Sequence, residues 1–109
     1  MFSSRFLFRS TPTMTATVAE LIPQHKVVVF SWVHCPYCVR AKEILKPIAP
    51  DMKVYECDEM ANGEDLRAQI LKSYNHETVP AIFINGEFIG GCSDLQAIQK
   101  SGELAKKLA

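Results

Sequence analysis

Net charge and long hydrophobic runs are what this sequence lacks. Twelve Lys and Arg residues balance twelve Asp and Glu residues in a chain of 109, so the formal charge at pH 7 is zero. This balance gives no electrostatic reason to bind nucleic acid or an anionic membrane surface. No apolar stretch approaches the ~20 residues that a transmembrane helix needs. We therefore expect neither nucleic acid nor a membrane among its partners.

Internal repeats, low-complexity blocks and a linker that would divide the chain are also absent. With 48% hydrophobic residues, a chain of this length is apolar enough to bury one core. The composition therefore predicts a single compact domain.

The first nineteen residues contain no acidic side chain, which sets them apart from the rest of the chain. They carry Arg5 and Arg9 with several Ser, Thr and Phe residues, a composition typical of a transit peptide. A disordered start with no targeting role is the alternative, and Met14 offers a second start site. The apolar stretch is too short and too interrupted for a secretory signal. We expect an N-terminal extension over residues 1–14, a folded domain over residues 15–109, and a cytoplasmic or mitochondrial protein that is not secreted.

Two of the four cysteines, Cys35 and Cys38, lie where a strand is expected to give way to a helix. The apolar run 27–30 predicts the strand, and Pro36 suits the first position of a helix. Unpaired N–H groups and the helix dipole favour negative charge there, which lowers the pKa of Cys35. This strand, C-x-x-C and helix form a redox signature, the alternative being two structural cysteines that happen to be close. Cys57 and Cys92 are isolated, and we expect buried apolar residues or incidental free thiols there.

The remaining pattern predicts alternating helices and strands. A short helix capped by Thr15 or Thr17 precedes the first strand, and Pro47 ends the helix that follows the cysteines. Alternation over 52–57 predicts a second strand, and the next helix covers about 64–73. Asn85-Gly86 joins two further strands, 80–84 and 87–90, in a hairpin. A last helix, capped by Ser93 or Asp94, is interrupted at Gly102. A thioredoxin-like α/β fold follows, with a four-stranded mixed sheet and helices on both faces.

Three motifs in this order resemble the dithiol glutaredoxins from about Val27 to the C-terminus. They are Cys35-Pro36-Tyr37-Cys38, Thr78-Val79-Pro80 and Gly90-Gly91-Cys92-Ser93-Asp94-Leu95. The resemblance implies a glutathione-dependent thiol–disulfide oxidoreductase that reduces protein–glutathione mixed disulfides and low-molecular-weight or protein disulfides. It makes Cys35 the nucleophile and Cys38 the resolving thiol, with a redox disulfide between them. Glutathione would be the co-substrate, glutathionylated and disulfide-containing proteins the partners, and the protein a monomer without a metal.

The resemblance also implies which residues hold glutathione. Val79-Pro80 suits a cis peptide bond, and in the family Thr78, Val79 and Pro80 hold the cysteinyl part. Glycines allow close backbone approach and a helix start can receive a carboxylate, which suits the γ-glutamyl end. Arg67 aligns with the position that meets the glycyl carboxylate, and Tyr37 packs beside the ligand. The glycyl, cysteinyl and γ-glutamyl contacts are thus expected from Tyr37, Arg67, Thr78, Val79, Pro80, Gly91, Cys92, Ser93 and Asp94.

One departure from the family is Trp32, where many glutaredoxins carry a lysine that binds glutathione. Arg67 or Lys26 would then supply part of the missing charge. Three alternatives remain open: a [2Fe–2S] cluster bridged between subunits through Cys35, a structural zinc site that includes Cys57, and a disulfide oxidase or isomerase of a secretory compartment. Pro36, the isolation of Cys57 and Cys92, and the missing signal peptide argue against them in turn.

Overall fold

The structure, a computed structural model, describes residues 16–109. The predicted N-terminal extension lies outside these residues. Within them, no helix is both long enough and apolar enough to cross a membrane.

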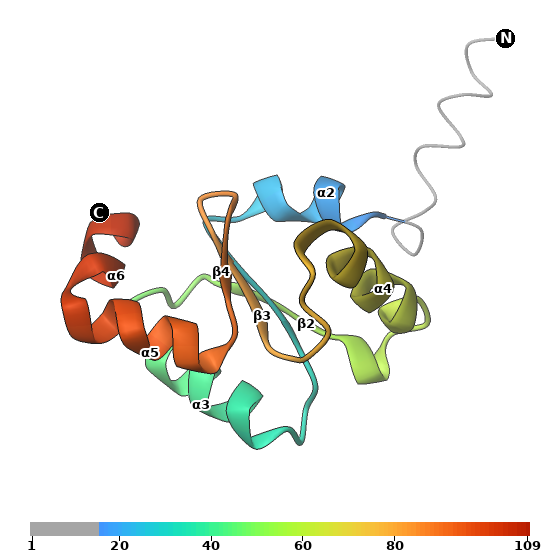
Figure 1. The fold of residues 1–109 in the computed structure, drawn as a ribbon, viewed down its shortest axis with the longest axis horizontal. Coiled ribbons are helices and arrows are strands. Elements are labelled where there is room, and N and C mark those ends of the chain that lie inside the picture. Colours follow the sequence, from blue (N-terminus) through green and yellow to red (C-terminus); the bar gives the residue numbers. More distant parts are fainter. Residues whose placement is uncertain (1–15) are drawn as a thin grey trace, which may run out of the picture.

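The described chain alternates helices and strands in the predicted order (Figure 1). Thr17 caps the first helix through the Glu20 N–H, as one of the two predicted capping residues. The elements are α2 (Val18–Leu21), η2 (Ile22–Gln24), β1 (Val27–Ser31), α3 (Pro36–Leu45), β2 (Lys53–Glu56), η3 (Cys57–Glu59), α4 (Gly63–Tyr74), β3 (Ala81–Ile84), β4 (Glu87–Gly90), α5 (Cys92–Ser101) and α6 (Glu103–Leu108).

Four strands form one mixed sheet in the order β2-β1-β3-β4. The β1 and β2 strands are parallel, because the α3 crossover returns the chain to the same end of the sheet. The β3 strand pairs antiparallel with both β1 and β4. Asn85 and Gly86 connect β3 to β4 with φ angles of 50° and 81°, the left-handed backbone that a tight hairpin requires. The mixed four-stranded sheet is as predicted.

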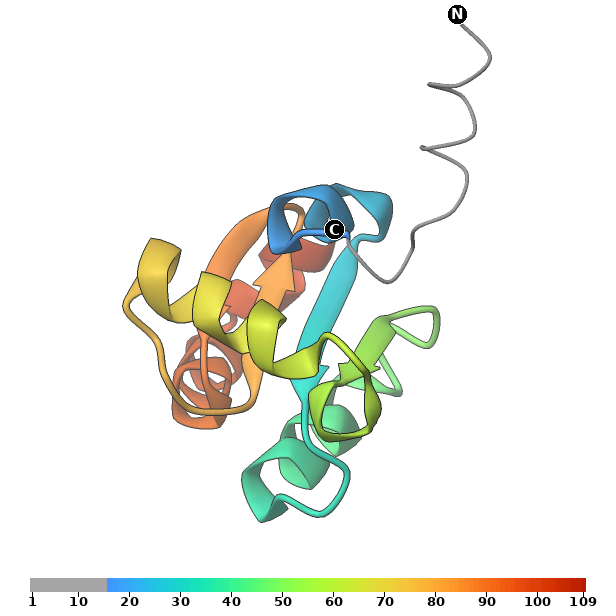
Figure 2. The same ribbon diagram turned by 90° about the vertical axis from the view of Figure 1, so that its right-hand side faces the viewer.

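Alternate side chains of β1 enter two separate cores, one on each face of the sheet. Val28 and Phe30 pack with residues of α2 and α4, whereas Val27 and Val29 pack with residues of α3, α5 and α6. The two views agree that α2 and α4 cover one face and the other three helices cover the opposite face (Figures 1 and 2). The chain has the predicted thioredoxin-like α/β fold. The C-x-x-C motif lies where the chain passes from the end of β1 into the start of α3.

Candidate active site

Cys35 caps the N-terminus of α3. Its extended backbone (φ −78°, ψ 122°) turns the chain from the loop after β1 into the helix, and Pro36 occupies the first helical position. The Cys35 carbonyl accepts the Val39 N–H at 2.9 Å, and the Cys35 N–H donates to the Trp32 carbonyl at 3.4 Å. The thiol is half-buried. The Cys35 sulfur is therefore accessible and lies beside the unpaired N–H groups of the first turn of α3.

The environment of Cys35 favours its thiolate. Partial burial acts to raise its pKa, but hydrogen bonds from the backbone N–H groups of Cys38 and Tyr37, a hydrogen bond with the Cys38 thiol and the charge of Lys42 outweigh that effect. The pKa of Cys35 is therefore lowered from its ordinary value. This agrees with the prediction from the helix N-terminus, since the donors are the orphan N–H groups of the first turn.

The environment of Cys38 favours its neutral thiol instead. Its side chain is 0% exposed, and burial raises the pKa of the Cys38 thiol to about 11. The Trp32 N–H lies 3.4 Å from its sulfur. Thus two thiols one helical turn apart differ in accessibility and in the direction in which their pKa values are shifted. All four cysteines of the described chain are free thiols in this structure.

The Thr78-Val79-Pro80 segment faces Cys35. The Val79–Pro80 peptide bond is cis, as predicted, and the Val79 carbonyl oxygen lies 3.9 Å from Cys35 Sγ. His76, which the sequence did not single out, holds this segment through a 3.0 Å hydrogen bond between its Nε2 and the Pro80 carbonyl. Because a carbonyl only accepts, Nε2 carries the proton.

The start of α5 adjoins the same segment. A Cβ atom on Gly91 would lie 3.5 Å from the His76 ring and 3.6 Å from the Pro80 carbonyl oxygen. The Asp94 carboxylate accepts the Gly91 N–H at 3.0 Å, so it caps its own helix. The Cys92 side chain is buried in the core, which leaves only its backbone to face a ligand, whereas Ser93 is exposed.

Arg67 is held in place at the other end of the Thr78–Val79 segment. Its guanidinium lies over the Trp32 ring, 4.7 Å from the centroid. It also donates to the Glu64 carboxylate at 3.1 Å and to the Glu77 carbonyl at 2.9 Å. Arg67, Thr78 and Val79 all line one small cavity of about 10 Å³. The structure therefore gives Trp32 a role that the sequence did not predict, as a platform for Arg67.

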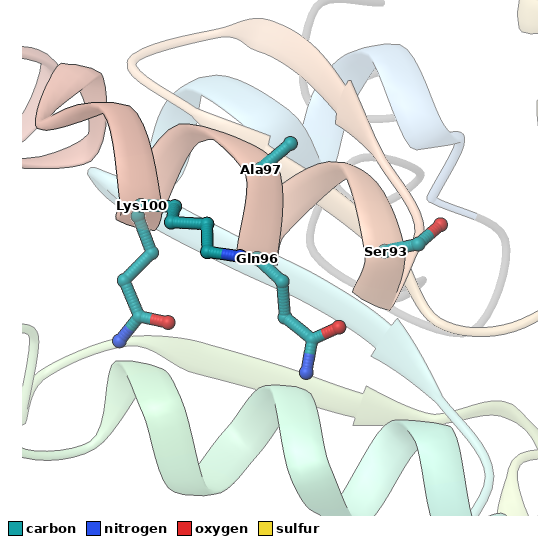
Figure 3. A pocket seen from close by; sticks show the side chains of 5 residues that line it. Ser93, Gln96, Ala97 and Lys100 are labelled. Atoms are coloured by element: carbon teal, nitrogen blue, oxygen red, sulfur yellow. The ribbon is translucent and has the colours of Figure 1, made fainter.

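Two further hollows flank these residues. One, of about 250 Å³, lies beside Arg67 between Glu64 and Glu77. The other is a groove of about 720 Å³ along α5, which begins at Ser93 and ends at Lys100 (Figure 3). Neither cysteine of the C-x-x-C motif lines the groove.

The predicted site residues lie together around Cys35. Tyr37 is exposed on α3, and the segment from Thr78 to Pro80 lies opposite the Cys35 sulfur. The residues from Gly91 to Asp94 lie beside that segment, and Arg67 lies at its far end.

The other two cysteines lie apart from each other. Cys57 belongs to the core on the α4 face of the sheet, and Cys92 to the core on the α3 face. Burial raises the pKa of Cys57 to about 11 and also raises that of Cys92. Within residues 16–109, no three His, Cys, Asp or Glu side chains are grouped to hold a metal ion.

Comparisons with known proteins show which family the chain belongs to. The family model described as Glutaredoxin matches residues 27–89. Glutaredoxin-2 of Schizosaccharomyces pombe is 39% identical over 99 residues, which cover 91% of this chain and 90% of that protein. The solution structure of a dithiolic glutaredoxin from Trypanosoma brucei brucei is 53% identical, with a TM-score of 0.80 and coverage of 92% of this chain and 99% of that one. A buckwheat glutaredoxin–glutathione complex is 31% identical, with a TM-score of 0.79 and coverage of 83% and 82%. The chain belongs to the glutaredoxin family and is a glutathione-dependent thiol–disulfide oxidoreductase.

Proposed function

We propose that this glutaredoxin reduces protein–glutathione mixed disulfides with Cys35 as the nucleophile, and protein disulfides with Cys38 as the resolving thiol. The observation that carries the proposal is the contrast between the two sulfurs. Cys35 is accessible and its pKa is lowered, whereas Cys38 is inaccessible and burial raises its pKa to about 11. Cys35 is therefore the thiol of the pair that can reach and attack an external disulfide.

Glutathione would lie across three groups of backbone and side chains. Its cysteinyl part would pair with the backbone of Val79, whose carbonyl already faces Cys35 Sγ. The γ-glutamyl carboxylate would meet the N–H groups at the start of α5, from Gly91 to Ser93. The glycyl carboxylate would meet the guanidinium of Arg67. A buckwheat relative has been solved with glutathione, and its similarity in fold supports this assignment.

The first half-reaction needs no added base. The Cys35 thiolate attacks the glutathione sulfur of the mixed disulfide, the bond to the protein sulfur breaks, and the protein leaves as a thiolate that takes a proton from water. Cys35 is then joined to glutathione. A second glutathione thiolate attacks that glutathione sulfur, releases oxidised glutathione and restores the Cys35 thiolate. The hydrogen bonds that lower the pKa of Cys35 also make it a good leaving group.

With a protein disulfide, the intermediate joins Cys35 to the protein, and Cys38 attacks Cys35 Sγ to release it. The products are a reduced protein and a Cys35–Cys38 disulfide. Two glutathione molecules then reduce that disulfide and become oxidised glutathione. This branch requires Cys38, whereas the branch through glutathione does not.

The test compares Cys35→Ser with Cys38→Ser on a glutathionylated peptide and on a protein disulfide. We expect Cys35→Ser to abolish both reactions, because it removes the nucleophile. We expect Cys38→Ser to retain reduction of the glutathionylated peptide and to lose at least about tenfold on the protein disulfide. Cys57→Ser is the matched control, since that thiol is buried in the opposite core. Activity that survives in Cys35→Ser would refute the proposal.

A further inference from the structure

His76 lies where two backbone segments of the site meet. Its Nε2 donates to the Pro80 carbonyl at 3.0 Å and lies 3.5 Å from the Thr78 hydroxyl oxygen. A Cβ atom on Gly91, the N-cap of α5, would lie 3.5 Å from the same ring and 3.6 Å from the Pro80 carbonyl oxygen. One imidazole therefore adjoins both the Thr78–Pro80 segment and the start of α5.

The imidazole is held from the side of the core. Asn75, the C-cap of α4, has a left-handed backbone (φ 57°, ψ 39°), which ends the helix and turns the chain. The His76 ring then packs edge-on against the ring of Phe88 on β4, with 5.3 Å between the centroids. Phe88 in turn packs against Tyr74 and Phe83, at centroid distances of 4.9 and 5.2 Å. Aromatic packing therefore fixes the position from which Nε2 donates.

The Pro80 carbonyl needs this donor. Pro80 is less than 2% exposed, and it comes just before β3, whose nearest pair with β4 joins Ile82 to Gly90. A buried carbonyl without a partner is costly, so the segment would shift towards another donor if the imidazole N–H were lost. Such a shift would carry Val79 with it, and the Val79 carbonyl oxygen lies 3.9 Å from Cys35 Sγ.

Glutathione spans both segments in the proposed function. Its cysteinyl part would pair with the backbone of Val79, and its γ-glutamyl carboxylate would meet the N–H groups at the start of α5. A ligand that touches two segments at once binds well only when their spacing matches its own dimensions. A disulfide that touches only one segment is insensitive to that spacing.

We propose that His76 is a positioning residue that fixes the spacing between the Thr78–Pro80 segment and the start of α5, and thereby sets the preference for glutathionyl disulfides. The inference rests on the proposed function, which places glutathione across these two segments. His76 acts through the Pro80 carbonyl, to which its Nε2 proton is already donated. The reactivity of Cys35 does not depend on it, because the N–H donors to that sulfur belong to the first turn of α3.

The experiment measures the first half-reaction on two disulfides of one peptide. The reduced full-length protein is mixed rapidly with a peptide whose cysteine is joined to glutathione or, in parallel, to free cysteine. Release of the peptide thiol gives a second-order rate constant for each. Free cysteine lacks the γ-glutamyl carboxylate, so it cannot span the two segments. We expect the native protein to react at least about tenfold faster with the glutathionylated peptide.

Three substitutions separate the hydrogen bond from the volume of the ring. His76→Gln keeps an N–H donor at about the reach of Nε2, whereas His76→Asn is one methylene shorter and His76→Leu has no donor. For His76→Asn and His76→Leu, we expect the rate with the glutathionylated peptide to fall at least about tenfold, and the rate with the cysteinylated peptide to change less than about threefold. His76→Gln should stay within about threefold of the native protein on both peptides. His25→Leu, which removes an exposed histidine at the end of η2, is the control and should change neither rate.

Alkylation of Cys35 by iodoacetamide distinguishes positioning from a general structural effect, and its rate should stay within about twofold of the native rate in every variant. Equal slowing on the two peptides, slower alkylation of Cys35, or a loss in His76→Gln as large as that in His76→Leu would overturn the positioning role. Rates within about twofold of native in both His76→Asn and His76→Leu would also overturn it. A native protein that reacts equally with the two peptides would instead refute the proposed function, and the inference with it.

Discussion

The Arg67 side chain is held by three groups before any substrate binds. The Trp32 ring lies under its guanidinium, and the Glu64 carboxylate and the Glu77 carbonyl accept from its two terminal nitrogens. A surface arginine normally loses side-chain entropy when a ligand orders it, and this loss has already occurred here. Trp32 thus supports a cation beside the site instead of supplying one.

Arg67→Gln should raise the KM for a glutathionylated peptide about tenfold and leave kcat within about threefold. A charge-assisted hydrogen bond contributes roughly 1.5–3 kcal/mol, and about 1.4 kcal/mol corresponds to one factor of ten. Arg67→Lys should not restore the KM, because an ammonium neither stacks on Trp32 nor donates in a planar fork. Steady-state kinetics measure both constants. Lys72→Gln removes a charge from the exposed side of the same helix and is the control; a KM increase equal to that of Arg67→Gln would contradict the assignment.

At the scale of the element, the first turn of α3 separates the reactivity of the four thiols. Its N–H groups and Lys42 overcome the partial burial of Cys35 and lower its pKa, whereas burial raises the pKa of Cys38 and of Cys57 to about 11 and also raises that of Cys92. The thiolate fraction, which governs reaction with an electrophile, should therefore differ strongly among them.

At neutral pH, iodoacetamide should alkylate Cys35 at least about tenfold faster than the other three cysteines. Because the pKa of Cys35 is lowered, its rate should persist as the pH falls below the ordinary cysteine pKa of about 8.5, while the buried thiols gain reactivity only at higher pH. Peptide mapping by mass spectrometry gives the rate at each site, and the three buried thiols are internal controls. Alkylation of Cys92 as fast as Cys35 would contradict this account.

Gly63, the first residue of α4, has no room for a side chain. A Cβ atom at this position would overlap the Cys57 carbonyl oxygen, so α4 packs directly on the η3 backbone. Sequence reasoning placed the helix start at about residue 64, one residue later. The close approach positions the helix that carries Arg67.

Gly63→Ala should destabilise the protein by about 1–3 kcal/mol, since the Cys57 backbone has to move. Chemical denaturation with a fluorescence readout from the single tryptophan, Trp32, measures the free energy of unfolding. Gly102→Ala is the comparison: its Cβ would meet nothing within 4 Å, but its φ of 87° is unfavourable for alanine. The expected cost there is about 1 kcal/mol. Equal costs at the two positions would exclude steric contact as the cause.

The whole molecule depends on two cores that share one sheet. Phe83 is fully buried on the α4 face, where its ring packs against the rings of Phe30, Tyr74 and Phe88 at centroid distances of 5.8, 5.1 and 5.2 Å. The neighbouring residues Ile82 and Ile84 enter the opposite core. A cavity in one core should therefore also weaken the packing of the other core, because both include side chains of the same strand.

Phe83→Ala should cost about 3–5 kcal/mol, a large part of the 5–15 kcal/mol by which domains are typically stable. Leu71→Ala, at an α4 side chain that is 43% exposed, should change stability by less than about 0.5 kcal/mol. Thermal unfolding monitored by circular dichroism should show one transition in each variant, since both cores depend on β1 and β3. Two separate transitions would contradict this coupling.

Much of the fold could be predicted because its signals are local. Apolar periodicity, Asn85-Gly86 and Pro47 report on neighbouring residues along the chain, so the order of elements and the mixed sheet follow from them. The C-x-x-C motif likewise places Cys35 at a helix start, where the lowered pKa of its thiol follows from the first-turn N–H groups. The cysteine pair and the cis Val79–Pro80 bond belong to this class. The last helix does not, because it begins at Cys92, ahead of the predicted caps Ser93 and Asp94, with Gly91 as its N-cap.

The sequence alone thus determined the element order, the site of the accessible thiol and the family, each of which depends on short motifs. Only the tertiary structure decided what Trp32, Ser31 and His76 touch. Ser31 meets Glu56 across 25 positions of the chain, and Lys42 meets the same carboxylate across 14. Such contacts depend on strand register and helix packing, which bring together segments whose separation in sequence carries no local signal. A serine at the end of a buried strand therefore becomes informative only once its neighbours in space are known.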